Sequence, residues 1–354
     1  MLTALELRNV RKTFGATVAV EGMDLVVPRG ALYGVIGPNG AGKTTCIRMI
    51  MSILFPDSGE LSVLGHRSSL EAKDRIGYLP EERGVYRKMK VGAFLIYMGE
   101  LKGLAAEDAA ARVPRLLQEV GLPGVESKRC EDLSKGMLQR VQFLAAVIHQ
   151  PDLLILDEPF SGQDPVSVRI LREHILKEHR RGATVLLSTH VMAHAEEMCQ
   201  HVVMIHQGRK VLDEAMAALR RQFDPRTIHF EPLDENATGS SLDAHANVSS
   251  LSAVGGVERV ETLHGSYRIT LLPGTDPAAM MSRLASAVAP ARIELARLTL
   301  EDVFVRIVAE GSHGKAASDA LRASVTAGAE GVLARSRVCG ESGSLPAGSS
   351  WLPS

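Results

Sequence analysis

The sequence has few cysteines and no long hydrophobic run. Its four cysteines, Cys46, Cys130, Cys199 and Cys339, are far apart in a chain of 354 residues and form no CxxC pair. This spacing argues against a metal-binding finger and against a disulfide framework, so reduced thiols are expected. No stretch approaches the roughly 18 uninterrupted apolar residues of a membrane-spanning helix, and the N-terminus lacks the apolar core of a signal peptide. We therefore expect a cytoplasmic protein, and any role at a membrane has to come through a partner.

An excess of either charge is also missing. The 40 Lys and Arg residues nearly cancel the 41 Asp and Glu residues. A protein whose main partner is nucleic acid or an anionic membrane surface usually carries a basic excess, so no nucleic-acid partner is expected. The apolar share of 45% is that of a soluble globular protein, and the length allows one large domain and a smaller one.

The first 222 residues alternate short apolar runs with longer segments of helical spacing. Strands are predicted at residues 5–10, 23–27, 31–36, 152–156, 183–188 and 201–206. Helices are predicted at residues 43–53, 107–120, 136–149, 165–181 and 192–199. The last four predicted strands are apolar on both faces, which is typical of a parallel sheet covered by helices. The order predicts an α/β domain over residues 1–222, with its ligand at the carboxyl ends of the strands.

The composition changes after residue 222. A small α+β domain is predicted over residues 223–310, in which residues 224–225 and residues 234–250 form a linker and a loose loop. Its predicted strands are residues 227–231, 257–263, 267–272 and 292–298, and its predicted helices are residues 277–288 and 300–309. Residues 311–354 are dominated by Gly, Ser and Ala without periodicity, which predicts a disordered tail.

A glycine-rich segment follows the predicted strand at residues 31–36 and opens a helix. It fits the pattern GxxxxGK[ST] and consists of Gly37, Pro38, Asn39, Gly40, Ala41, Gly42, Lys43, Thr44 and Thr45. Such a loop turns its backbone N–H groups toward a phosphate, beside the positive end of a helix dipole. Lys43 is then expected to bridge the β- and γ-phosphates of ATP, and the Thr44 hydroxyl to ligate Mg²⁺. A chance glycine-rich turn is the alternative, which the strand–loop–helix context disfavours.

The apolar strand predicted at residues 152–156 ends in two carboxylates, Asp157 and Glu158. Asp157 is expected to hold Mg²⁺, and Glu158 to accept a proton from the water that attacks the γ-phosphate, because strand side chains alternate. A strand that simply ends in solvated acids is the alternative. His190 follows the next predicted strand, where an imidazole can donate to the γ-phosphate or orient the water.

The segment of residues 133–140, LSKGMLQR, resembles the signature motif of ABC ATPases. A second anion site is expected at the start of this helix, formed by Ser134 and the N–H groups around Gly136. The site has no use within its own chain, because the glycine-rich loop already encloses the phosphates. The resemblance implies a P-loop NTPase of the ABC-ATPase type, with a mixed sheet and a helical subdomain. It also implies a head-to-tail homodimer in which Ser134 caps the ATP of the other copy. Lys135 stands where glycine is usual, and we favour a solvent-facing side chain over a contact with the γ-phosphate.

Three further segments agree with this family. Phe14 stands where an aromatic ring stacks on adenine, with a core phenylalanine as the alternative. Asp164 ends a segment, SGQD, that resembles the loop along the dimer interface and has Gln163 where leucine is usual. The resemblance makes Asp164 a candidate for nucleotide binding. Glu81 stands at the position of the family glutamine. A carboxylate there can still reach Mg²⁺ or the attacking water, so Glu81 is kept as a catalytic and metal candidate, although it adds negative charge beside a triphosphate.

Residues 77–86, GYLPEERGVY, and the signature segment resemble sodium-efflux ATP-binding subunits, which pair with ABC-2-type permeases. The resemblance implies an exporter ATPase bound to the inner face of the cell membrane through an integral-membrane permease. A soluble ABC ATPase of translation or DNA repair and a regulatory nucleotide-binding subunit are the alternatives. The cargo is not encoded, because the ATPase subunit does not contact it.

Overall fold

The computed structural model describes residues 2–82, 84–222, 227–233, 241–263, 265–296 and 299–311. The chain divides into two compact units, Met1–Leu300 and a second one from Glu301 onward. Within the described ranges, no helix is both long enough and apolar enough to cross a membrane. The division into residues 1–222, 223–310 and 311–354 stays a prediction, and the predicted tail lies outside the described residues from residue 312 on.

A six-stranded mixed sheet forms the centre of the first unit. Its strand order is β5 (Ile76–Leu79), β6 (Leu153–Asp157), β7 (Thr184–Thr189), β3 (Leu32–Ile36), β8 (His201–His206) and β9 (Arg209–Ala215). The first five strands are parallel, and β9 is antiparallel to β8. Because β3, β6 and β7 are buried along their whole length, they require cover on both faces. The predicted α/β class with a mixed sheet is confirmed.

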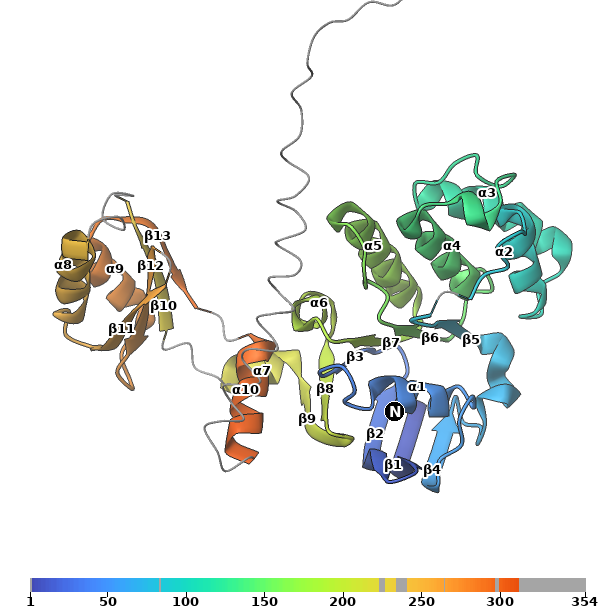
Figure 1. The fold of residues 1–354 in the computed structure, drawn as a ribbon, viewed down its shortest axis with the longest axis horizontal. Helices are drawn as coiled ribbons and strands as arrows, with labels where there is room; N and C mark the ends of the chain where they lie inside the picture. The colour runs from blue at the N-terminus through green and yellow to red at the C-terminus, as the bar shows by residue number, and fades with distance from the viewer. Residues whose placement is uncertain are drawn as a thin grey trace, which may run out of the picture. The chain divides into compact units, whose positions relative to one another are not determined.

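Helices cover both faces of this sheet. Figure 1 shows α4 (Lys135–Val147) and α5 (Pro165–Arg181) on one face and α1 (Lys43–Ile50) on the other. The helices α2 (Val91–Glu100) and α3 (Ala106–Glu119) pack together and against α4. The remaining helices of this region are α6 (Met192–Met198) and α7 (Met216–Gln222), with short 3-10 segments at Ser69–Arg75 and Cys130–Asp132.

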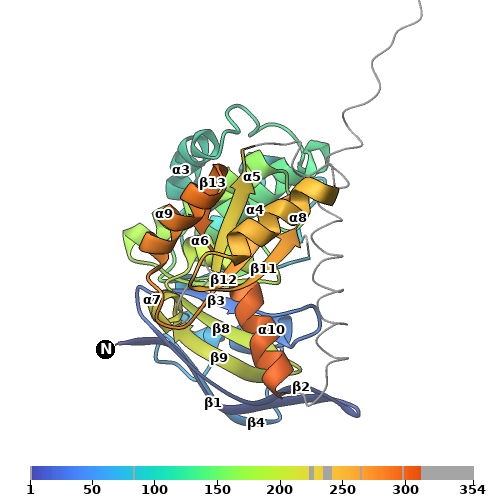
Figure 2. The same ribbon diagram turned by 90° about the vertical axis from the view of Figure 1, so that its left-hand side faces the viewer.

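A three-stranded antiparallel sheet covers α1. Its order is β2 (Thr17–Pro28), β1 (Thr3–Phe14) and β4 (Ser58–Val63), and Figure 2 shows the long β1 and β2 beside β4. Their apolar side chains share one core with α1 and the six-stranded sheet, including Leu5, Leu7, Val20, Met23, Ile47, Ile50 and Ile155. Burial of such side chains stabilises the packing by about 1.5–3 kcal/mol each. This core fixes the start of α1 relative to the strand ends.

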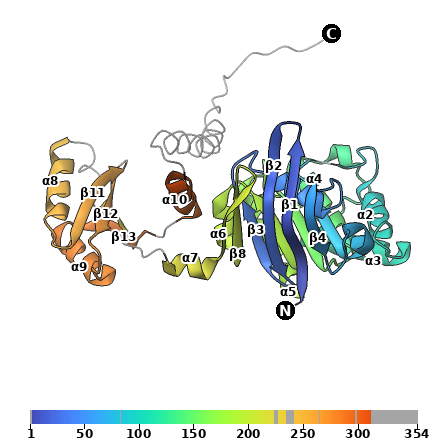
Figure 3. The ribbon, with the colours of Figure 1, turned by 90° about the horizontal axis from the view of Figure 1, so that it is seen from below.

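A separate four-stranded antiparallel sheet follows, in the order β11 (Val257–Leu263), β12 (Ser266–Leu271), β10 (Thr227–Pro232) and β13 (Pro290–Leu295). Figure 3 shows α8 (Ser241–Ser252) and α9 (Pro277–Ala287) on one face of it. Its core contains Ile228, Phe230, Leu251, Tyr267, Met280 and Leu284. Helix α10 (Leu300–Gly311) follows.

One prediction for this region is wrong. Residues 234–250 were expected to be a linker and a loose loop, but residues 241–252 form α8. The segment is rich in polar residues, so its helical spacing is weak. Only Val248 and Leu251 of its C-terminal half are recorded in the core of the small sheet, and that contact holds the helix. Residues 234–240 lie outside the described part of the chain.

Candidate functional site

The glycine-rich loop lies between the carboxyl end of β3 and the first residue of α1. Gly37, Gly40 and Gly42 have φ values of 151°, 77° and 108°, in the region that side chains rarely adopt. A Cβ atom on Gly37 would lie 2.1 Å from the carbonyl oxygen of Ile205, and one on Gly42 would lie 2.4 Å from that of Ala19. Glycine is therefore required at two of these positions by close backbone packing as well as by φ.

Lys43 begins α1 with its side chain buried at the centre of the site. Its ammonium donates to the carbonyl oxygens of Gly37 at 2.8 Å and Pro38 at 3.1 Å, and lies 3.6 Å from Glu158 Oε1. Burial lowers the pKa of Lys43, and the charges of Glu158 and Asp157 oppose this shift. The lysine thus connects the glycine-rich loop to the carboxylates at the end of β6.

Asp157 is the last residue of β6, in register with Ser188 of β7. Its side chain is 1% exposed, and among the described residues its carboxylate oxygens have no hydrogen-bond partner beyond the nearby hydroxyl groups of Ser188 and Thr44. Burial raises the pKa of Asp157, while the hydroxyl groups of Ser188 and Thr44 act in the opposite direction. Burying a carboxylate with so few partners costs free energy. Its oxygens beside the Thr44 hydroxyl are the hard donors that Mg²⁺ prefers, so these residues fit that ion.

Glu158 has a left-handed backbone, with φ at 49°. This conformation ends the strand alternation at Asp157, and the Glu158 N–H donates to the carbonyl oxygen of Ser188 at 3.0 Å. A non-glycine residue in this region stores roughly 1–3 kcal/mol of strain. The Glu158 side chain is 6% exposed, and its Oε2 lies 2.9 Å from His190 Nδ1.

His190 follows β7, and 38% of its side chain is exposed. The hydrogen bond with Glu158 raises the pKa of His190, while burial lowers it. Protonation places N–H donors on both ring nitrogens, so Nδ1 can hold Glu158 while Nε2 donates elsewhere. The structure therefore brings together Lys43, Asp157, Glu158 and His190, which the sequence predicted as neighbours.

Glu81 is exposed and follows β5 at the edge of the same sheet. Burial of Lys43 and His190 and their contacts with Glu158 have the larger effects on the pKa of each group. The negative charge of Glu81 has a smaller effect and raises both pKa values. The side chain is thus within electrostatic range of the site.

Phe14 is 49% exposed at the end of β1, which excludes the alternative of a core phenylalanine. Lys12 Nζ lies 5.7 Å from the centroid of its ring. Phe14 pairs with Thr17 at the start of β2, and β2 packs against the glycine-rich loop through Ala19. The aromatic ring is therefore carried by the hairpin that contacts the loop.

The predicted second anion site is built on α4. Ser134 is exposed and caps the helix, with its Oγ accepting from Met137 N at 3.3 Å. Gly136 packs so closely that a Cβ atom would lie 2.9 Å from Ser167 Oγ. Among the hydrogen bonds and ion pairs recorded for the described residues, none joins Ser134 or Gly136 to residues 37–45.

Asp164 caps helix α5. Its Oδ1 accepts from Val166 N and Ser167 N, both at 3.0 Å, and its Oδ2 accepts from Ser167 Oγ at 2.7 Å. These hydrogen bonds lower the pKa of Asp164. The side chain that was predicted to contact nucleotide therefore has a structural role within its own chain.

Sequence reasoning missed Ser188 and the backbone carbonyls of Ala19 and Ile205 that shape the site. Ser188 left a signal, because a fully buried hydroxyl in the apolar strand β7 requires a polar neighbour. The two carbonyls left none, since any residue type supplies one.

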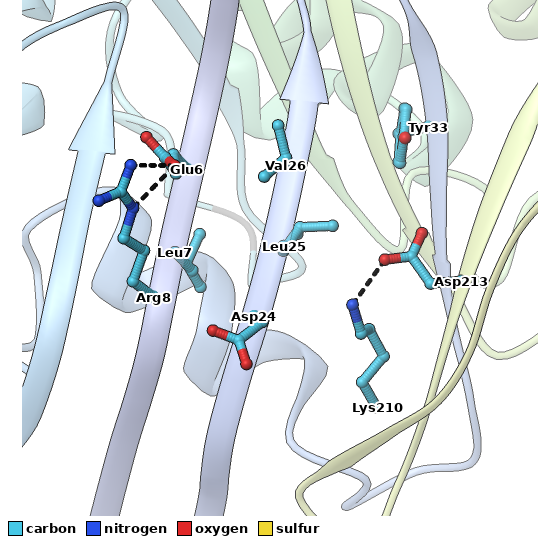
Figure 4. Close-up of a pocket in the computed structure, with 9 residues that line it drawn as sticks. All are labelled: Glu6, Leu7, Arg8, Asp24, Leu25, Val26, Tyr33, Lys210 and Asp213. Carbon is cyan, nitrogen blue, oxygen red and sulfur yellow. Dashed lines mark hydrogen bonds and ion pairs between the residues drawn. The ribbon is translucent and has the colours of Figure 1, made fainter.

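A pocket of about 420 Å³ lies apart from the predicted residues, between β2 and β9 (Figure 4). It is lined by Glu6, Leu7, Arg8, Asp24, Leu25, Val26, Tyr33, Lys210 and Asp213. Glu6 pairs with Arg8 at 2.7 Å and Lys210 with Asp213 at 2.6 Å, while Asp24 accepts from Asn9 N. Its charged groups therefore have partners within the protein.

Three features together define a P-loop nucleoside triphosphatase. They are a largely parallel sheet, a glycine-rich loop that leads from β3 into a helix starting with Lys-Thr, and a buried aspartate at the end of β6, with β7 between β6 and β3. A family model for ABC transporters matches residues 20–161. The chain is 42% identical over 227 residues to the uncharacterized ABC transporter ATP-binding protein YhaQ of Bacillus subtilis. The aligned residues cover 64% of this chain and 76% of that protein. It is 38% identical over 216 residues to Nod factor export ATP-binding protein I of Cupriavidus metallidurans, covering 60% and 71% of the two chains.

Solved structures agree. The structure of an ATP-binding subunit of an ABC transporter matches with a TM-score of 0.58 at 34% identity, over 62% of this chain and 93% of that one. The ADP conformation of MJ1267, an ATP-binding cassette, matches in fold with a TM-score of 0.53 at 21% identity, over 61% and 92%. The chain belongs to the ATP-binding proteins of ABC transporters, the ATPases that drive transport.

Proposed function

We propose that two copies of this chain bind two MgATP molecules head to tail and drive an ABC-2-type exporter permease from the inner face of the cell membrane. The observation that carries the proposal is the division of functional groups. Lys43, Asp157, Glu158 and His190 converge, while Ser134 stands exposed on another element. A second copy related by two-fold symmetry supplies the missing Ser134 to each site.

Each residue has a distinct role in this proposal. Phe14 stacks on adenine, and the backbone of residues 37–42 surrounds the phosphates. Lys43 leaves its contacts with the loop carbonyls to bridge the β- and γ-phosphates. Thr44 and Asp157, with Glu81 as a further candidate, hold Mg²⁺, which neutralises phosphate charge when bound.

Glu158 accepts the proton of the attacking water, a role that is typically worth ~10²–10⁴ in rate. His190, held through Nδ1 by Glu158, donates from Nε2 to the γ-phosphate. The hydrogen bond that raises the pKa of His190 favours the doubly protonated ring which this role needs. Glu158 and His190 thus act as a hydrogen-bonded pair, the first on the attacking water and the second on the γ-phosphate.

The direction of transport and the type of permease are finer parts of the proposal. Five of the relatives, with 34–38% identity, are named Nod factor export ATP-binding protein I, which supports export. The signature segment and residues 77–86 support pairing with an ABC-2-type permease. If this is correct, the chain sediments with membranes only when that permease is produced with it.

Complementation between two inactive variants tests the shared site. Lys43→Ala removes the phosphate contact of a chain, and Ser134→Arg blocks the site on its partner. In a mixed dimer both defects fall on one site and the other is intact. Mixing the two purified variants should therefore restore part of the ATPase activity. Activity that stays absent in the mixture, although both variants are folded, contradicts the proposal.

A further inference from the structure

Two glutamine side chains join helix α4 to the loop that begins at Glu158 and comprises residues 158–164. The amide nitrogen of Gln163 donates to Gln139 Oε1, and the amide nitrogen of Gln139 donates to the carbonyl oxygen of Pro159. Gln139 lies in the second turn of α4 and is 7% exposed. The hydrogen bonds form a continuous series, the glutamine series, from the loop to the helix and back to the residue beside Glu158.

The loop transmits displacement because its backbone is held at several points. Ser161 N donates to the carbonyl oxygen of Glu158 at 3.2 Å, and Gln163 N donates to that of Phe160 at 3.3 Å. The buried Phe160 ring packs edge to face on His194, with 4.7 Å between the ring centroids. A shift of Gln163 therefore moves the backbone near Glu158 instead of being absorbed by the loop.

The other end of the series contacts the predicted second anion site. A Cβ atom on Gly136 would lie 3.3 Å from Gln163 Oε1, so the backbone of Gly136 packs directly on this side chain. Ser134 caps the same helix two residues earlier. A group that binds at Ser134 and Gly136 is thus one side chain away from the loop that carries Glu158.

We propose that Gln139 and Gln163 are positioning residues that couple nucleotide contact at Ser134 and Gly136 to the position of the Glu158 carboxylate. The inference rests on the proposed function, in which Ser134 contacts the nucleotide of the partner copy. Binding of that phosphate shifts the start of α4, and the glutamine series carries the shift to Pro159. Glu158 then reaches the attacking water of its own site only when the other site is filled.

The glutamine series of this chain depends on an amide at position 163, although leucine is usual there in the family. Gln163 uses its N–H to donate to Gln139, and Gln139 uses its oxygen to accept and its nitrogen to donate to Pro159. Leucine at position 163 keeps a similar volume but offers no hydrogen bond. Glutamate keeps the shape but has no N–H, so Gln139 has to give up one of its two partners.

Steady-state kinetics of the full chain tests the coupling. In Gln163→Leu, Gln163→Glu and Gln139→Leu, kcat should fall roughly tenfold to 10²-fold, the cost of a catalytic group displaced by about 1 Å. The KM for ATP should change little, and the Hill coefficient should approach one. The double variant Gln139→Leu with Gln163→Leu should be no slower than either single variant, because one series is broken only once.

Gln142→Leu is the matched control, since Gln142 is 6% exposed on the same helix. In the part of the chain that the structure describes, no recorded hydrogen bond joins Gln142 to residues 158–164. The control should keep kcat, KM and the Hill coefficient. An unchanged kcat in Gln163→Leu and Gln139→Leu, or an equal loss in Gln142→Leu, would overturn the coupling.

A second measurement separates this inference from the proposed function. Gln163→Leu in a Glu158→Gln background should still dimerise with ATP in light scattering, because the coupling acts after assembly. If the Glu158→Gln chain itself stays monomeric, the proposed function fails and the coupling with it. If Glu158→Gln dimerises but its combination with Gln163→Leu does not, Gln163 is an interface residue and only the coupling is overturned.

Discussion

Glu158 Oε2 lies 2.9 Å from His190 Nδ1, while Oε1 of the same carboxylate lies 3.6 Å from Lys43 Nζ. One buried carboxylate therefore links the phosphate-binding loop to the residue that follows β7. This arrangement depends on the left-handed backbone of Glu158, which ends the regular strand after Asp157. The predictions that follow test how these groups control one another.

The pKa of His190 should fall when Glu158 is neutralised. The hydrogen bond with Glu158 is the largest cause of the raised pKa, so Glu158→Gln should bring the pKa of His190 down, toward or below 6.5. An NMR titration of the imidazole signals checks this. Glu81→Gln is the control and should lower the pKa less, because Glu81 is the weakest of the causes. A pKa that is equal in Glu158→Gln and in the unmodified chain contradicts the pairing.

The same contact makes stability depend on pH. Because the folded pKa of His190 is raised, the His190–Glu158 contact contributes its full stability below the unfolded pKa of about 6.5. The contribution is lost as pH rises through the folded pKa. Denaturant titrations should show a loss of stability over that interval which His190→Asn removes. An unchanged pH dependence in that variant contradicts the assignment.

Asp157→Asn should separate stability from ligand binding. Burial raises the pKa of the Asp157 carboxyl even with the Ser188 and Thr44 hydroxyl groups beside it, so an uncharged amide should leave the free chain as stable or more stable. The rise in melting temperature caused by MgATP should shrink or disappear, because a ligand stabilises the folded state less as its dissociation constant rises. Thermal denaturation with and without MgATP measures both effects. A clearly destabilised free chain that keeps its MgATP shift would be the opposite result.

Gly42→Ala and Gly40→Ala form a matched pair in the glycine-rich loop. Both positions have positive φ, which costs a side chain roughly 1–2 kcal/mol. A Cβ atom at Gly42 would also lie 2.4 Å from the carbonyl oxygen of Ala19, whereas nothing lies within 4 Å at Gly40. Gly42→Ala should therefore lose about 1–3 kcal/mol more stability and most ATP binding. Equal losses in the two variants contradict the packing of β2 against the loop.

Ser134→Arg should abolish turnover without weakening ATP binding. Ser134 is exposed, so arginine there should leave the fold intact, and the nucleotide bound by the chain contacts other residues. Equilibrium binding of a fluorescent ATP analogue and a steady-state ATPase assay measure the two properties. Gln118→Arg, at an exposed position of α3, is a control for added charge and should keep both ATP binding and turnover. Parallel loss of binding and turnover in Ser134→Arg would place Ser134 at its own chain's nucleotide.

The predictable part of this fold is the part with strong local patterns. The strands at β3, β6, β7 and β8 are continuous apolar runs, and each was predicted to within one residue of its bounds. Strands β4, β5 and β9 were missed because they lie at sheet edges, where they are short or half exposed and their pattern is weak. Helix α8 was missed because polar residues dominate it.

The site shows the same limit. Asp157 ends a strand, and Lys43 and His190 come after the ends of two others. The order of these strands fixes where their ends meet, so the convergence of the three residues follows from sequence. The left-handed turn at Glu158 does not, because backbone conformation at a single polar residue depends on its tertiary surroundings. Gln139 and Gln163 are 24 residues apart, and only the packing of α4 on the loop brings them into contact.

Light scattering of purified Glu158→Gln chains in excess MgATP tests the central claim most directly. The proposed split site predicts a mass twice that of one chain with MgATP, and the mass of one chain without nucleotide or after Ser134→Arg is added. A variant that binds MgATP fully and keeps the mass of a single chain would contradict the account.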